Sequence, residues 1–264
     1  MRRQIALSAA VLLCSAAACF AQSQGDARRL TAAETAAIIP LLCQNPVSQK
    51  DGDYACTAII GYPDSAPNDA TISLDAITYG AFTTANADEA YVSYTASFEP
   101  HANNFGGGIA LARSGDRWRL ESWYPGHQMS DCLALPDTGT QRMLCRGTYE
   151  GMGEADSSVW IRQVPFDHDQ AILKAQDQRQ SDTNLPCETP TRAILLSIGA
   201  LKRSDDPHVF AVVPITYAAA PDLARACLRK DFKDVAETRG EARFVLQDGK
   251  LKALTPVHFA PPDY

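Results

Sequence analysis

The chain has 264 residues, of which 45% are hydrophobic, and its 24 basic and 31 acidic side chains give a formal net charge of −7. Nucleic acids and anionic membranes are not expected as partners, because binding phosphate groups needs clustered lysine and arginine, and basic residues here occur in pairs at most. A chain of this length buries about 70% of its unfolded surface. We therefore predict an acidic folded protein that needs no cofactor.

The N-terminus has the pattern of an export signal. Arg2 and Arg3 precede an uncharged, alanine-rich stretch that ends at Phe20, and small residues allow cleavage after Ala21. A lipid anchor at Cys19 is the alternative, although the large aliphatic residue usual three positions before a lipidated cysteine is missing. We expect a bacterial protein, periplasmic or secreted, that loses residues 1–21 and has no transmembrane segment in its mature chain.

Six cysteines lie beyond this signal, at Cys43, Cys56, Cys132, Cys145, Cys187 and Cys227. An even number in an exported chain indicates disulfides, and six cysteines allow 15 pairings. Spacing favours three local bridges, Cys43–Cys56, Cys132–Cys145 and Cys187–Cys227. Zinc is disfavoured because no CxxC occurs and no histidine lies within four residues of any of the six.

The first half of the chain predicts one helix followed by strands. Thr31 and Glu34 form a capping box, and the helix that it begins should end near Pro40. Strand patterns follow over residues 54–62, 76–83, 90–98, 107–113 and 117–124. The last four should form an antiparallel meander, whose final hairpin turns at Gly115.

The second half repeats this order in part. Strand-like stretches at 141–149 and 158–164 precede a polar segment, 170–179, for which we predict a helix, and then a linker at 181–190. Further strands are expected at 192–202, 209–218, 242–247 and 250–255, with a helix at 221–229.

We therefore predict an α+β protein that is predominantly antiparallel β. It should contain two related four-stranded meander units with a few short helices, stapled by disulfides. The expected divisions are an N-terminal unit at 30–165, a helix and linker at 166–190, and a C-terminal unit at 191–264.

Catalytic motifs are not found in the sequence. It contains no Gly-x-Ser-x-Gly elbow, no Ser-x-x-Lys and no phosphate-binding glycine loop, and its five histidines are scattered without an HExxH pair. We therefore predict neither a catalytic constellation nor a metal site.

The candidate binding residues are Trp123, in a predicted strand, and His127, Glu99 and His101, in predicted loops. Strict alternation along strand 117–124 places Trp118 and Trp123 on opposite faces, so Trp123, together with His127, would form a recognition surface. The alternative is that the two indoles cover the two faces of a thin sheet. Glu99 and His101 lie in a polar loop able to bind sugar hydroxyls or assist acid–base chemistry, although a plain hairpin loop also explains them.

These patterns favour an exported, disulfide-stabilised protein that binds an envelope ligand or another exported protein without catalysis. The alternatives are a cell-envelope hydrolase that uses loop carboxylates, Glu150 among them, with a histidine, and an inhibitor of another exported protein.

Overall fold

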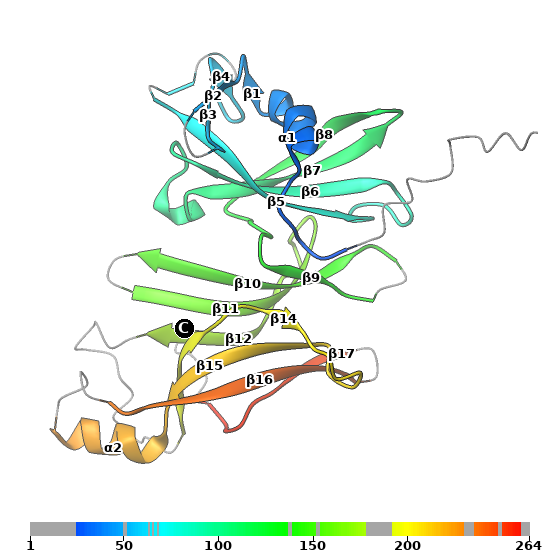
Figure 1. Cartoon of the computed structure of the whole chain (residues 1–264). Helices are drawn as coiled ribbons and strands as arrows, with labels where there is room; N and C mark the ends of the chain where they lie inside the picture. The colour runs from blue at the N-terminus through cyan, green and yellow to red at the C-terminus, as the bar shows by residue number, and fades with distance from the viewer. Residues whose placement is uncertain are drawn as a thin grey trace, which may run out of the picture.

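Alternating apolar and polar residues build most of the described chain as antiparallel β-sheet, with two short α-helices. A computed structural model describes residues 25–49, 52–62, 64, 66–67, 69–136, 139–151, 154–177, 192–229, 235–247 and 250–259. Within them, sheets of six, four and five strands are stacked in layers from top to bottom of Figure 1. The predicted class, predominantly antiparallel β with short helices, is confirmed, whereas the division into two related four-stranded units is not.

The six-stranded sheet has the order β2-β3-β5-β6-β7-β8. Its strands are β2 (Val47–Ser48), β3 (Tyr54–Ala55), β5 (Thr71–Gly80), β6 (Glu89–Ala96), β7 (Gly106–Ser114) and β8 (Arg117–Pro125). One face is covered by helix α1 (Ala32–Ile38), the 3-10 turn η1 (Ile39–Leu41) and a small ladder of β1 (Cys43–Gln44) with β4 (Ala58–Ile59). The capping box at the start of α1 is confirmed, because the Thr31 hydroxyl accepts from the Glu34 N–H and the Glu34 carboxylate accepts from the Thr31 N–H.

The other two sheets contain the rest of the described strands. The four-stranded sheet has the order β12-β11-β10-β9, with β9 (Cys132–Ala134), β10 (Arg142–Gly151), β11 (Glu154–Gln163) and β12 (Gln170–Asp177). The five-stranded sheet contains β13 (Ile194–Ile198), β14 (Lys202–Arg203), β15 (Ala211–Ala218), β16 (Glu237–Gln247) and β17 (Lys250–Leu254), and helix α2 (Ala220–Arg229) packs at its end. Neither described helix is long and apolar enough to cross a membrane.

Three apolar clusters hold the layers together. Between the four- and five-stranded sheets lies the largest, with Leu144, Val159 and Phe244 fully buried. A second cluster joins α1 and η1 to the six-stranded sheet. The third lies between the six- and four-stranded sheets, is built around Tyr91 and Phe166, and includes the Cys132–Cys145 disulfide. Burial on both faces of the four-stranded sheet therefore positions it as the central layer.

The disulfides follow the predicted local pairing. Cys43 bonds to Cys56 and Cys132 bonds to Cys145, each across 13 residues of sequence. These two bridges are confirmed. Cys227 is disulfide-bonded, and its predicted partner Cys187 lies outside the described residues.

Two predicted elements are wrong. The single strand expected over residues 54–62 is divided into β3 and β4, which belong to different sheets. Residues 170–177 form strand β12, paired with β11, where we predicted a helix. Leu173 and Ala175 alternate into the large core cluster, so tertiary packing outweighs the helical propensity of the Gln and Lys residues around them. The remainder of the predicted helix and the linker at 181–190 lie outside the described residues.

Candidate functional site

Glu99 lies in the polar loop for which we predicted binding or acid–base chemistry, and its side chain is buried. Its side chain accepts from the Tyr94 hydroxyl at 2.7 Å and from the Asn103 amide at 2.8 Å. Burial, aided by this carboxylate, raises the pKa of Tyr94, so that the phenol stays protonated and donates. Glu99 therefore holds its own loop against the sheet.

Trp123 joins the same network. Its indole N–H donates to the Tyr94 hydroxyl at 2.6 Å. A bulge in the pairing of β7 with β8 leaves Glu121 without a register partner, so Trp118 and Trp123 both pack against the α1-side cluster. The predicted placement of the two rings on opposite faces is therefore wrong, because it assumed an unbroken alternation; both rings are partly buried.

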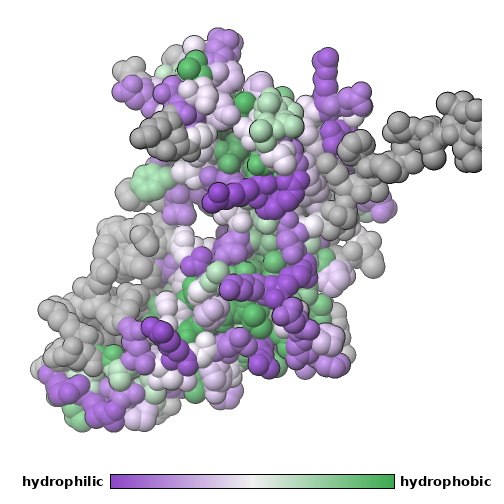
Figure 2. Space-filling view, in the orientation of Figure 1, coloured by the Kyte–Doolittle hydropathy of each residue, from purple (hydrophilic) through white to green (hydrophobic). Residues whose placement is uncertain are grey.

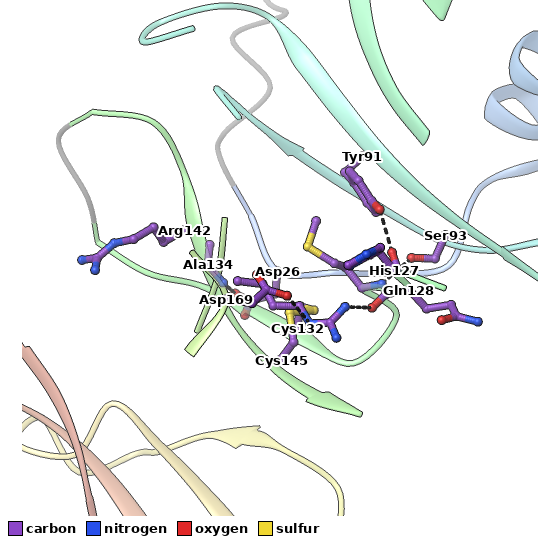
Figure 3. The surroundings of a disulfide bond; sticks show 12 residues. Asp26, Tyr91, Ser93, His127, Gln128, Cys132, Ala134, Arg142, Cys145 and Asp169 are labelled. Atoms are coloured by element: carbon purple, nitrogen blue, oxygen red, sulfur yellow. Dashed lines mark hydrogen bonds and ion pairs between the residues drawn. A yellow bond between two sulfur atoms is a disulfide. The ribbon is translucent and has the colours of Figure 1, made fainter. Parts of the chain in front are cut away.

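His127 lies half-buried at the end of β8, with its ring stacked on Phe166 at a centroid distance of 4.3 Å. Its backbone carbonyl accepts from the Tyr91 hydroxyl at 2.6 Å, as Figure 3 shows. Burial, with the positive charge of Arg162 nearby, lowers the pKa of His127, so the ring is neutral at pH 7. Its Nδ1 atom is buried without a hydrogen-bond partner.

The two other residues proposed from the sequence are placed by their backbones alone. His101 begins the short 3-10 turn η3 (His101–Asn103), and Glu150 lies near the end of β10. Their side chains lie outside what the structure describes. The structure thus links Glu99 to Trp123 through Tyr94, and it does not join these two to His127 in one site.

A groove with a volume of about 360 Å³ lies between the six- and four-stranded sheets. Its walls come from β5 and β6 on one side and from β10 and β11 on the other, and the loops at 102–104 and 126–131 line it as well. Figure 2 shows the molecule hollowed between the upper and lower layers. Its size lies in the range of small-molecule binding sites.

Asp75 lines this groove from a β-bulge. The pairing of β5 with β6 shifts between Leu74 and Ala76, which leaves Asp75 without a register partner. Its carboxylate accepts from the Thr95 hydroxyl at 2.8 Å, and both residues line the groove. Burial, with a smaller effect of the Asp53 charge, raises the pKa of Asp75 above its usual value. Bulges commonly redirect a side chain toward a site, and this one presents a partly desolvated carboxylate to the cavity.

Trp160 and Arg162 occupy the opposite wall. They alternate with Val159 and Ile161 along β11, so Ser158, Trp160 and Arg162 share the groove face while the aliphatic residues enter the core. Here too the pairing is irregular, because the register of β11 with β12 shifts between Val159 and Trp160. The groove therefore has one partly exposed indole beside a guanidinium.

Each arginine in the groove has a carboxylate close by. Arg146 lies 3.6 Å from Asp131 and also donates to the Ile198 carbonyl at 3.0 Å. Arg162 lies 3.5 Å from Asp169 and donates to the Gln128 carbonyl. Burial raises the pKa of Asp131 above its usual value even though Arg146 opposes the shift. The positive charges are thus held in place and compensated.

Sequence reasoning missed this groove. Its residues come from six separate segments of the chain between Asp75 and Arg162, and none carries a recognised motif. One local signal was present, because Ser158, Trp160 and Arg162 are the polar and aromatic half of an otherwise aliphatic strand.

Among the described residues, no three His, Cys, Asp or Glu side chains gather closely enough to hold a metal ion. Comparison with protein-family models, with curated proteins and with solved structures finds no match to this chain.

Proposed function

We propose that the protein is a non-catalytic binding protein whose ligand occupies the groove between the six- and four-stranded sheets. The observation that supports this most directly is the groove itself, a cavity of about 360 Å³ with Trp160 on one wall and Asp75 on the other. Binding sites are concave and contain a few placed polar groups, and this open groove has both features.

We also propose that the protein is exported to an oxidising compartment. The chain carries the pattern of a signal peptide at residues 1–21, and two disulfides join cysteines of the described region. Disulfides persist in the periplasm and outside the cell, whereas cytosolic thiols are kept reduced. Periplasmic fractionation, followed by mass spectrometry of the mature N-terminus, tests this part. A chain retained in the cytosol with its first residues intact would contradict it.

The proposal that the groove binds the ligand can be tested by filling the groove with a bulky side chain. Ala102 is exposed and lines the groove, so Ala102→Trp places a bulky ring inside it, whereas Ser114→Trp adds the same ring at an exposed hairpin position outside it. We expect some members of a panel of sugars, peptides, amino acids and nucleosides to raise the melting temperature of the natural protein and of Ser114→Trp, but not that of Ala102→Trp. If no compound stabilises the natural protein, or if Ala102→Trp responds normally, the proposal fails.

A hydrolase is the second candidate, and the structure changes which residues it would use. Glu99 is already bonded to Tyr94 and Asn103, while Asp75 and Asp131 both line the groove with pKa values raised by burial. A carboxyl group with a raised pKa suits a general acid. The test is to incubate cell-wall polymer with the natural protein and with the variants Asp75→Asn and Asp131→Asn. If the natural protein releases product and both variants lose this activity while they remain folded, the hydrolase is favoured over simple binding. No observation on the described residues favours the inhibitor hypothesis.

A further inference from the structure

We infer that the ligand of the groove is an uncharged, hydroxyl-rich saccharide chain. The inference rests on the proposed binding function and specifies the chemistry of its ligand. It comes from the charge balance of the groove, from the position of Trp160 and from the mixture of donors and acceptors that the walls present.

The groove is lined by charged side chains of both signs. Two arginines, Arg146 and Arg162, line the groove, and so do two aspartates, Asp75 and Asp131. Arg146 is paired with Asp131, and Arg162 is paired with Asp169 behind it. A site for phosphate or carboxylate would need uncompensated positive charge, and a site for a cationic ligand would need the reverse. The groove has no uncompensated positive charge, which disfavours an anionic ligand. Asp75 is a lining carboxylate without a cationic partner among the described residues; it accepts from Thr95 and can also accept from a ligand, so an uncharged ligand that donates hydrogen bonds fits the groove.

Trp160 provides a flat apolar surface within this polar groove. Its ring is partly exposed, and the Arg162 guanidinium lies 6.0 Å from the ring centroid, on the same face of β11. A pyranose ring has one face of C–H groups that packs on an aromatic ring, because the ring face carries partial negative charge. A partly exposed indole in a polar cavity therefore suits a sugar better than it suits a fully apolar ligand.

The remaining walls offer both donors and acceptors. Thr95, Ser130 and Ser158 contribute hydroxyl groups, and Asn104 and Gln128 contribute amides. A sugar hydroxyl donates one hydrogen bond and accepts others, so it needs partners of both kinds side by side. The Asp75 carboxylate, turned to the groove by its bulge, is a planar acceptor able to receive bonds from two adjacent hydroxyls.

Loop contacts keep these groups in place before a ligand arrives. The Gln128 amide donates to the Asn104 carbonyl at 3.2 Å, and the Asn104 amide donates to the Thr148 carbonyl at 3.1 Å. The loop from the six-stranded sheet is thus tied to the edge of the four-stranded sheet, along the wall of the groove. Such preorganisation favours binding because less side-chain freedom is lost.

The test compares ligand classes on the full mature protein by isothermal titration calorimetry. The probes are oligomers of glucose, oligomers of N-acetylglucosamine, uronic-acid oligomers and short peptides. We expect one of the two uncharged saccharide series to bind, with an affinity that changes less than about threefold between low and high salt. The two neutral arms separate plain glucans from amino-sugar polymers as the source.

Variants of the indole locate the binding. We expect Trp160→Ala to weaken saccharide binding by about tenfold or more, and Trp160→Phe to weaken it by about threefold or less. Tyr62→Ala is the matched control, because Tyr62 is 44% exposed and lies outside the groove. It should bind as the natural protein does. Circular dichroism of each variant establishes that it is folded.

The outcomes separate this inference from the proposed function. One outcome is that peptides or uronic acids bind, that Ala102→Trp blocks their binding, and that no neutral saccharide binds. This result would overturn the saccharide inference but would keep the groove as a binding site. Saccharide binding unaffected by Trp160→Ala would overturn it as well. Failure of every probe class would remove the binding function itself.

Discussion

The two faces of the four-stranded sheet differ sharply, although both are covered by another sheet. Toward the five-stranded sheet, residues such as Leu144 and Val159 form a continuous apolar core. Toward the six-stranded sheet, part of the face packs as an aromatic cluster around Tyr91, and the rest opens as the polar groove with Trp160. One face is thus packed with apolar side chains, whereas the other is only partly packed and leaves a polar cavity.

The difference arises from the neighbouring layers. Strands β12 and β13 lie close together where the four- and five-stranded sheets meet, so their side chains interdigitate. On the other face, the aromatic cluster joins the sheets at one end, and the Cys132–Cys145 disulfide lies within it, as Figure 3 shows from β9 to β10. The groove extends beside this contact.

The largest effect should come from the apolar face. Phe244 is fully buried in the core between the four- and five-stranded sheets, so Phe244→Ala should lower the free energy of unfolding by about 3–5 kcal/mol. Ser130→Ala, on the exposed rim of the groove, should change it by less than about 0.5 kcal/mol. Denaturant unfolding measures both. Similar losses in the two variants would remove the contrast between the faces.

The second-largest loss of stability should come from removing the Cys132–Cys145 disulfide, which lies on the groove side of the four-stranded sheet. Replacing Cys132 and Cys145 together by alanine removes a bridge across 13 residues, which should cost about 3 kcal/mol. The same change at Cys43 and Cys56 should cost a similar amount but should leave ligand binding in the groove unchanged, because that bridge lies beyond the six-stranded sheet. Unfolding curves together with ligand titrations distinguish the two. Equal effects on binding would argue against a local role for Cys132–Cys145.

Gly108 allows the Tyr91 side chain to pack closely against the six-stranded sheet. A Cβ atom added to Gly108 would lie 2.1 Å from the Tyr91 hydroxyl oxygen, so Gly108→Ala should destabilise the protein by about 1–3 kcal/mol and disturb the aromatic cluster. Gly139→Ala is the control, since its added methyl group meets no atom within 4 Å. Thermal unfolding and near-UV circular dichroism report both effects. An unaltered Gly108→Ala protein would show that the tyrosine can move away.

The smallest effect should come from the groove carboxylate. Burial raises the pKa of Asp75, so the folded protein favours its protonated form, and the charged form destabilises the fold as pH rises through that pKa. Asp75→Asn should therefore raise the melting temperature at pH 7 by about 1–3 °C, and the gain should disappear below the ordinary aspartate pKa of about 3.9. Melting curves between acid and neutral pH measure this. A variant less stable than the natural protein at pH 7 would contradict it.

Local features of this fold could be predicted from sequence because their causes are local. The capping box at Thr31 and the pairing of Cys43 with Cys56 depend on residues close together in the chain. The β12 segment could not be predicted, because its strand conformation depends on pairing with β11 and on burial of Leu173. The tryptophan faces were wrong for a similar reason, since one bulge at Glu121 reverses the alternation after it.

Composition, charge, spacing and periodicity by themselves determined an acidic, disulfide-bonded protein rich in antiparallel strands. Only the tertiary structure decided that Asp75, Trp160 and Arg162 line one cavity while Glu99 is buried away from it. The physical reason is that a site between two sheets is assembled from strands distant in sequence. Its side chains are directed by bulges and by the stacking of layers, which leave no fixed spacing in the chain.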